Sequence, residues 1–210
     1  MKYGADYFVS RNPACAGAFH HNLFAILARY CRPGARYLDV GAGMGYLSEW
    51  LARRGQGSVT AADISPYALA RVAELGLGIH TKLLDVGATK DFGGPYDVIF
   101  MIHCLEHLEQ PAVALRTLRD QLAPGGQIVV VVPNCGWHYR RLLGDRIWGH
   151  NDPTHLQFFT ARSLQHLLAS VFSDARVFTY PVPALWELSP RLARFLSFGW
   201  GLHLIAVGRR

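Results

Sequence analysis

The chain of 210 residues is long enough for one α/β domain and too short for two domains of ordinary size. Half of its residues are hydrophobic, which excludes a disordered chain. The formal net charge of +6 permits an anionic partner such as a nucleotide-linked substrate, a nucleic acid or a membrane surface. The basic residues are dispersed, however, and a solvated surface explains them at least as well.

Neither a membrane span nor a secretion signal is predicted. The most apolar run, residues 128–132, has the length of a buried strand. The apolar C-terminal region is interrupted by Glu187, Arg191 and Arg194, which allows contact with a membrane surface but not a span. Four cysteines without CxxC spacing indicate reduced thiols, so we expect a cytoplasmic protein.

Hydrophobic periodicity and turn residues predict alternating helices and strands. In chain order these are a helix over 15–30, strand 36–40, helix 46–54, strand 58–62, a helix beginning after it, strands 79–84 and 96–102, helix 110–122, strand 128–132, helix 161–171 and strands 175–178 and 202–207. Ser65 is the expected N-cap of the helix that begins after strand 58–62, and Pro66 is its expected first residue. Pro124, Gly125 and Gly126 are expected to stop the helix over 110–122.

This alternation predicts an α/β fold with a parallel sheet and right-handed crossovers. Strand 128–132 is almost uniformly β-branched, which is typical of a central strand. Residues 133–159 are rich in Trp, His, Tyr and Arg, and they are too many for an ordinary connection. We therefore predict one domain in which a lid that covers the substrate is inserted after the fifth strand.

The strongest motif is LDVGAGMG at residues 38–45, between a predicted strand and a helix. Glycines there allow a tight turn and close approach to a ligand, and the helix N-terminus offers N–H donors. Its spacing is GxGxG, and Tyr46 stands where a dinucleotide fingerprint has its third glycine. The loop therefore suits a ligand without a pyrophosphate, such as an adenosine that carries an amino acid.

Three acids follow or end the first three predicted strands. Asp63 is placed to accept hydrogen bonds from both ribose hydroxyls, and Asp85 to meet an adenine amino group. Asp39 could organise the loop amides or meet the ligand's ammonium group through water. Each acid alone is explained by a cap or a turn, but together they favour a nucleoside site.

The successive motifs LDVGAGMG, ADIS, LLDV, YDVIFMIHCLEHL and LAPGGQIVVVVPN resemble those of class I S-adenosylmethionine methyltransferases. The chain is most similar to the branch of ubiquinone-pathway O-methyltransferases and small-molecule or sugar methyltransferases. The resemblance implies a Rossmann-like sheet, mostly parallel with an antiparallel last strand, and helices on both faces. The implied cofactor-binding residues are Asp39, Gly41, Gly43, Gly45, Asp63, Ile64, Asp85, Val86, Ile102 and His103. The glycines and Asp39 would line the methionine side of the cofactor, and Asp63 would hold the ribose. Asp85 and Val86 would contact the adenine, and Ile102 or His103 would close the site.

Methyl transfer to a hydroxyl needs positioning and a base, for which histidine is the usual candidate. His155, in the predicted lid, is the first candidate for this base or for a substrate-facing partner, and His107 is the second. Both histidines have structural alternatives: His155 could tie the lid to the sheet, and His107 could brace a local helix with Glu106. In some relatives an acid in the position of His103 forms a divalent-metal site with the Glu-His pair. Since Mg²⁺ prefers oxygen ligands, the sequence favours no metal here.

We expect a methyltransferase that acts at oxygen on a small acceptor, such as a sugar precursor or a quinone-like phenol. The net charge permits this acceptor to be anionic. The expected divisions are a helical cover (1–33), a cofactor-binding core (34–133), the lid (134–160) and a closing region (161–210). A nicotinamide enzyme is disfavoured because GxGxxG and YxxxK patterns are absent. A nucleic-acid methyltransferase is the first alternative, although IHCLEH replaces a DPPY-like run. A non-catalytic cofactor-binding subunit is the second alternative.

Overall fold

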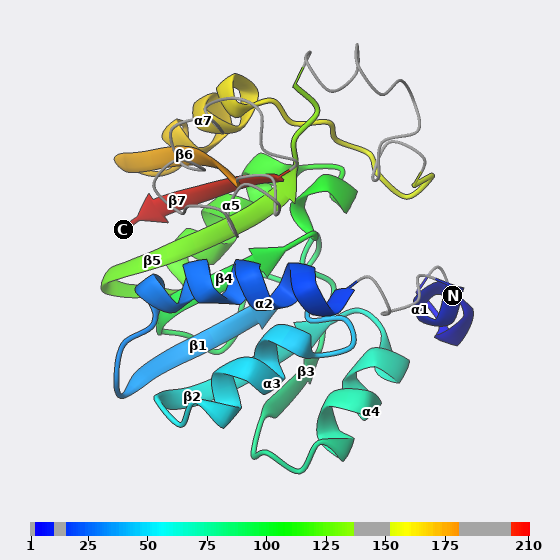
Figure 1. Cartoon of the computed structure of the whole chain (residues 1–210). Helices are drawn as coiled ribbons and strands as arrows, with labels where there is room; N and C mark the ends of the chain where they lie inside the picture. Colours follow the sequence, from blue (N-terminus) through cyan, green and yellow to red (C-terminus); the bar gives the residue numbers. More distant parts are fainter. Residues whose placement is uncertain (1–2, 11–15, 137–151, 181–202) are drawn as a thin grey trace. The chain divides into compact units, whose positions relative to one another are not determined.

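The computed structural model describes residues 3–10, 16–136, 152–180 and 203–210 (Figure 1). Most of the predicted lid, residues 137–151, lies outside the described residues, as do residues 181–202. Within the described ranges, no helix has the length and apolar character needed to cross a membrane.

Seven strands of the described residues form one sheet in the order β3-β2-β1-β4-β5-β7-β6. Their bounds are β1 (Ala35–Val40), β2 (Gly57–Asp63), β3 (His80–Leu83), β4 (Tyr96–Ile102), β5 (Leu122–Pro133), β6 (Asp174–Tyr180) and β7 (His203–Arg209). β2 runs parallel to β1 and β3, whereas β7 runs antiparallel to β5 and β6. The predicted fold, a mostly parallel sheet with an antiparallel last strand, is confirmed.

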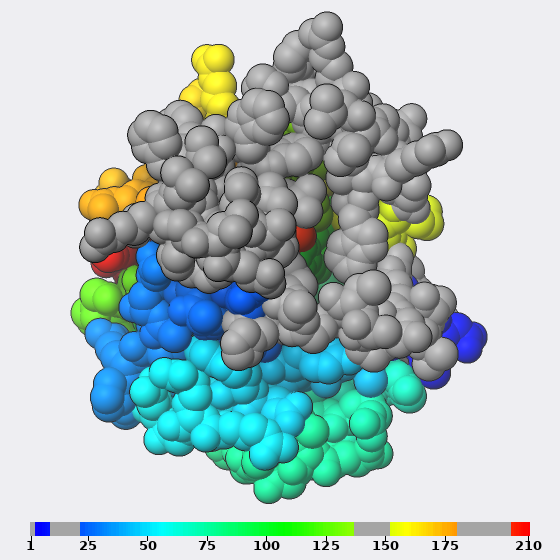
Figure 2. Space-filling view, in the orientation of Figure 1, coloured from blue at the N-terminus to red at the C-terminus, as the bar shows by residue number. Residues whose placement is uncertain are grey.

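The chain divides into two compact units, and the first comprises Met1–Phe100 and Gln121–Gly126. Its helices are α1 (Ala5–Ser10), α2 (Ala16–Leu27), α3 (Tyr46–Arg53) and α4 (Pro66–Glu74), and the 3-10 turn η2 (Ala28–Tyr30) follows α2. α3 packs on β2, and α4 packs on β2 and β3. Both α3 and α4 form part of the molecular surface (Figure 2). Ser65 is the predicted N-cap of α4, since its hydroxyl accepts a hydrogen bond from Ala68 N at 3.3 Å.

The second unit comprises Met101–Asp120 and Gln127–Arg210. It contains η3 (Leu105–His107), α5 (Pro111–Asp120) and α7 (Ala161–Ala169). α7 packs on β6 and β7 and contacts α5, with Leu164 and Leu168 fully buried. Residues 128–132 of β5 are also fully buried, as expected for a central strand.

The elements that were expected occur in the structure in the expected order, and the limits differ most at the start of β5. α5 ends at Asp120, and β5 already begins at Leu122, so Pro124 and Gly125 belong to this strand rather than to a separate turn. Gly125 has a φ of +72°, and Pro124 has no N–H to donate. Both residues are tolerated because they lie near the strand's beginning. The short α1 and η3 were not predicted.

Gly208 provides a test of packing between β7 and the segment after α7. A Cβ built at Gly208 would lie 2.6 Å from the ring of Phe172, whose side chain is buried. We expect Gly208→Ala to lower the free energy of unfolding by about 1–3 kcal/mol because the ring must move. Urea unfolding measures this loss. A smaller leucine side chain at residue 172 leaves room for the new methyl group, so the double variant Gly208→Ala/Phe172→Leu should lose less stability than the two single variants lose together. Unchanged stability of Gly208→Ala would contradict this packing.

Candidate functional site

The loop between β1 and α3 turns through three glycines with left-handed backbone angles. The φ values of Gly41, Gly43 and Gly45 are +70°, +52° and +81°. An L side chain is strained in this region, which is why the sequence has glycine at these positions. Gly41 N and Ala42 N both donate to Ala62 O, at 2.8 and 3.1 Å, so the loop begins in contact with β2.

Asp63, the last residue of β2, holds the glycine loop in place. Its side chain is buried, and its Oδ2 accepts a hydrogen bond from Gly43 N at 2.8 Å. Its Oδ1 accepts from Ser65 N, also at 2.8 Å. One carboxylate therefore fixes the glycine loop and the chain entering α4. From the sequence we considered Asp39 for organising the loop amides, but the described contact to a loop amide comes from Asp63.

Asp39 lies within β1 and is buried, with 2% of its surface exposed. Ser48 Oγ of α3 donates to Asp39 Oδ2 at 2.7 Å. Burial raises the pKa of Asp39 to about 7, and the nearby charge of Asp63 adds to this, while hydrogen bonds from Ser48 oppose it. Ser48 was not predicted as a partner of Asp39, although a serine on the buried side of an amphipathic helix is a signal for such a partner.

The remaining predicted cofactor residues of the first unit follow β2 and β3. Asp85 is exposed, and its Oδ1 accepts from Gly87 N at 2.8 Å, which is an Asx turn. Ile64 is 46% exposed, and Val86 is half-buried. Because the carboxyl ends of parallel strands meet at one edge, Asp85 and these apolar side chains lie at the same sheet edge as Asp63.

An aromatic side chain of α1 lies beside the glycine loop. Phe8 stacks on Tyr67 of α4 with ring centroids 6.2 Å apart, and Tyr7 packs edge-on against Phe8. A Cβ built at Gly43 would lie 3.5 Å from Phe8 Cε1. No pattern in the sequence indicated that Phe8 adjoins the loop.

In the second unit, the end of β4 carries a histidine in an unusual conformation. Ile102, half-buried, is the last residue of β4, and His103 after it has a φ of +51°. The His103 backbone N–H donates to Val131 O at 2.8 Å, and its Nδ1 lies 3.2 Å from Glu106 Oε1. A non-glycine residue with positive φ is uncommon and is found at functional sites. The His103 and His203 rings also pack against each other edge to face. Burial, together with the charge of His103, lowers the pKa of His203 well below its usual value.

Glu106 connects the turn after β4 to the segment that begins at residue 152. Only 1% of Glu106 is exposed, and its backbone carbonyl accepts hydrogen bonds from Leu156 N and Gln157 N, both at 2.9 Å. A local helix braced by Glu106 and His107 was one alternative from the sequence, and the chain forms the 3-10 turn η3 there. The backbone contacts bring a distant histidine, His155, to the same place.

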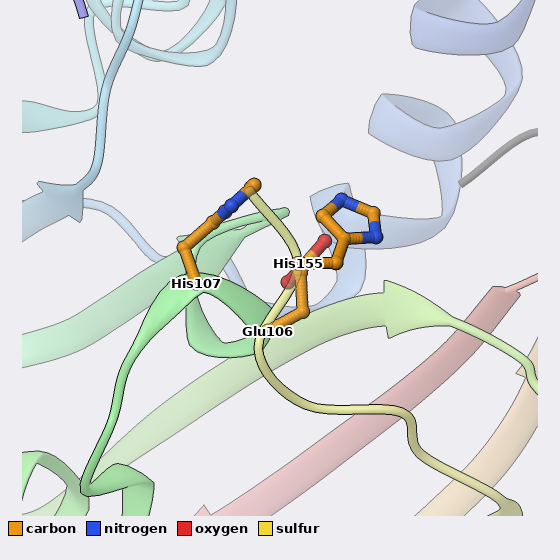
Figure 3. A group of neighbouring side chains, drawn as sticks. All are labelled: Glu106, His107 and His155. Carbon is orange, nitrogen blue, oxygen red and sulfur yellow. The ribbon is translucent and has the colours of Figure 1, made fainter. Parts of the chain in front are cut away.

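His107 and His155 are neighbours in the structure although 48 positions separate them in the sequence. Their ring centroids are 4.7 Å apart, and the rings meet edge to face. Together with Glu106 they form a cluster in which the potential ligand atoms all lie within 4.8 Å of one another. Figure 3 shows Glu106 and His107 leaving one turn of the chain, while His155 reaches them from a separate segment. The two predicted base candidates thus belong to one site.

A second set of polar groups supports both histidines. His107 Nδ1 lies 3.1 Å from both the carbonyl oxygen and Oγ1 of Thr154. His155 Nε2 lies 3.6 Å from Asp152 Oδ2. Thr154 donates to Asp152 Oδ1 from its N and Oγ1, at 2.9 and 2.6 Å. These partners were not predicted, because turn contacts within residues 152–154 have no periodic signal.

Comparison with known proteins identifies related chains. Residues 12–171 match the family described as "Methyltransferase domain". The "Ubiquinone biosynthesis O-methyltransferase" of Pseudomonas aeruginosa (strain LESB58) is 35% identical over 106 residues. That match covers 48% of this chain and 45% of the relative, so the aligned part spans less than half of the curated relative's length.

Solved structures of other methyltransferases share the fold. The plantazolicin methyltransferase BpumL in complex with SAH has a TM-score of 0.67 at 18% identity, covering 98% of this chain and 88% of that chain. An S-adenosylmethionine-dependent methyltransferase from Mesorhizobium loti has a TM-score of 0.68 at 20% identity, covering 92% of this chain and 100% of that chain. At these identities the likeness concerns the fold alone.

Asp39 predicts how stability depends on pH. In the unfolded chain Asp39 ionises near 3.8, but in the folded chain it keeps its proton until a pH of about 7. The proton on folded Asp39 contributes its full stabilisation below pH 3.8. As the pH rises from 3.8 to about 7, the free energy of unfolding falls by about 1.4 kcal/mol per pH unit until this contribution is lost. Urea unfolding between these pH values should show this decline in the wild type and a weaker one in Asp39→Asn. Asp120→Asn, at an exposed site, is the matched control, and identical profiles for the wild type and Asp39→Asn would contradict the assignment.

Proposed function

Because this chain belongs to the methyltransferase family, we propose that it transfers a methyl group from S-adenosylmethionine to an oxygen atom of a small-molecule acceptor. The cofactor is S-adenosylmethionine, since this family uses it and structural neighbours contain its product SAH. The observation that carries the oxygen acceptor is the cluster of Glu106, His107 and His155, which offers bases for the proton that a hydroxyl must lose.

The first unit binds the cofactor in this proposal. Each oxygen of Asp63 accepts one hydrogen bond in the described residues, so its other lone pairs can accept from the ribose hydroxyls. Asp39, with its raised pKa, would be ionised by the ammonium group of the methionine part, because an opposite charge favours the carboxylate. The loop glycines border the methionine part. Ile64, Asp85 and Val86 form the adenine side.

The transfer itself breaks the bond between sulfur and the methyl carbon and forms a bond between that carbon and the acceptor oxygen. The sulfonium loses its positive charge, and the hydroxyl proton passes to a base. His155 is that base in our proposal, and Asp152 stabilises the imidazolium that results. His107, with Nδ1 in contact with Thr154, is the second candidate. His103 and Ile102 are assigned to the closing side of the cofactor.

The acceptor class is a quinone-like phenol or a sugar precursor. The phenol is supported by the "Ubiquinone biosynthesis O-methyltransferase" relatives, which align with half of this chain. The formal net charge of +6 is compatible with an acceptor that carries a phosphate or a carboxylate. Nucleic acid is a weaker candidate because the basic residues are dispersed along the sequence.

Asp63→Ala tests the assignment of the ribose ligand. The variant loses the carboxylate that would accept from the ribose and that positions Gly43, so we expect the affinity for SAH to fall by about 1–3 kcal/mol, or roughly five- to 150-fold. Isothermal titration calorimetry measures this change, and Asp120→Ala serves as an exposed control. Wild-type affinity in a folded Asp63→Ala protein would rule out this role.

His155→Gln tests the base. A panel of phenols and sugar phosphates is first incubated with S-adenosylmethionine that carries a labelled methyl group, and mass spectrometry locates the label. With the acceptor found, we expect His155→Gln to lower kcat about 100- to 10,000-fold while SAH affinity stays unchanged. His166→Gln, at an exposed histidine of α7, should keep wild-type activity. Methylation of nitrogen or carbon would refute the oxygen acceptor, and full activity of His155→Gln would refute the base.

A further inference from the structure

We propose that Ser48 is a positioning residue of the cofactor site, which holds Asp39 for the ammonium group of the methionine part. Ser48 Oγ of α3 donates to Asp39 Oδ2 of β1 at 2.7 Å, and both residues are buried. Asp39 precedes Gly41, the first glycine of the loop, by two positions. The inference rests on the proposed function, because it requires S-adenosylmethionine or SAH to bind at this loop.

The place of Ser48 in α3 is explained by Asp39. Leu47, Ser48 and Leu51 form the buried side of this helix, and Ser48 is fully buried. A hydroxyl in such surroundings is destabilising unless it forms a hydrogen bond, and alanine at this position would favour the helix more. The bond to Asp39 Oδ2 satisfies the hydroxyl, so this serine serves the acid rather than the helix.

The hydrogen bonds from Ser48 fix the Asp39 carboxyl group and leave it able to bind a cation. A carboxylate has about four lone-pair sites, and Ser48 uses only part of them. Burial raises the pKa of Asp39 to about 7, and the hydrogen bonds from Ser48 oppose this rise. Ser48 therefore favours the charged form of Asp39, which is the form that an ammonium group binds.

The charged groups on the elements around Asp39 act in different ways. Asp63, at the end of the neighbouring strand β2, raises the pKa of Asp39 through its charge. On α3, Glu49 and Arg53 form an ion pair with each other at 2.8 Å. On β4, Asp97 accepts from the backbone N–H near the start of β1, whereas Asp39 lies near the end of that strand. A cationic ligand beside Asp39 would therefore meet two carboxylates, those of Asp39 and Asp63.

Ligand binding should release a proton from Asp39. In the free protein Asp39 keeps its proton until a pH of about 7, and a bound ammonium group lowers this pKa because the opposite charge favours the carboxylate. The ammonium group of a free amino acid stays charged throughout this range. The affinity for SAH should therefore rise with pH, by up to about tenfold per pH unit, and level off above a pH of about 7.

The experiment is calorimetric titration of the full-length protein with SAH from about pH 5 to 9, in buffers with different heats of ionisation. The difference between the buffers gives the number of protons released. We expect close to one proton per SAH at about pH 6 and almost none at about pH 9 in the wild type. Asp39→Asn should release none at either pH, which separates this proton from any that a histidine loses.

Variants of Ser48 test the positioning role directly. Ser48→Ala removes the hydroxyl, so the pKa of Asp39 should rise further and the affinity should level off at a higher pH. We expect SAH affinity to fall roughly five- to tenfold at about pH 6 and less at about pH 9. Ser48→Thr keeps the hydroxyl and should restore the wild-type profile. Ser58→Ala, at an exposed serine of the same unit, is the matched control.

The possible failures have different signatures. Absence of SAH binding in the wild type would refute the proposed function and this inference together. SAH binding that is lost in Asp63→Ala but has the same pH dependence in the wild type and Ser48→Ala would refute the positioning role alone. Equal proton release by the wild type and Asp39→Asn would also refute it. Circular dichroism verifies folding, and if Ser48→Ala does not fold, Ser48→Cys, whose thiol is a weaker donor, provides the test.

Discussion

The glycine loop depends on one buried carboxylate. A chain that leaves β1 and enters α3 through Gly41, Gly43 and Gly45 adopts left-handed angles that only glycine accepts without strain, and such a loop is entropically costly to order. Asp63 offsets part of this cost by accepting from Gly43 N, and the same side chain fixes Ser65 at the start of α4. The residue that we propose as the ribose ligand therefore also shapes the glycine loop.

The chemistry proposed for the second unit depends on a comparable backbone contact. The carbonyl of Glu106 accepts from Leu156 N and Gln157 N, and this brings His155 to His107. Since one fold supports many reactions, the function must be argued from these side chains rather than from the sheet. The role that we propose for the cluster, removal of a proton from the acceptor, depends on these side chains being held together.

The sequence predicted what periodicity and turn chemistry encode. The strand limits 96–102 agree with β4, and the N-cap Ser65 and the acids at the ends of β2 and β3 were placed correctly. It did not predict that Ser48 donates to Asp39, that Phe8 adjoins Gly43, or that His155 meets His107. These are contacts between distant segments, and no local pattern of residue types specifies them. The roles of the individual cofactor residues and of the histidines stay predictions.

The central claim is that the first unit binds S-adenosylmethionine, and calorimetric titration of the purified protein with SAH and, separately, with NADH tests it most directly. A GxGxG loop followed by Asp63 predicts micromolar binding of SAH and no binding of NADH. Binding of NADH alone would contradict the account, and the glycine loop would then have to be assigned to a dinucleotide.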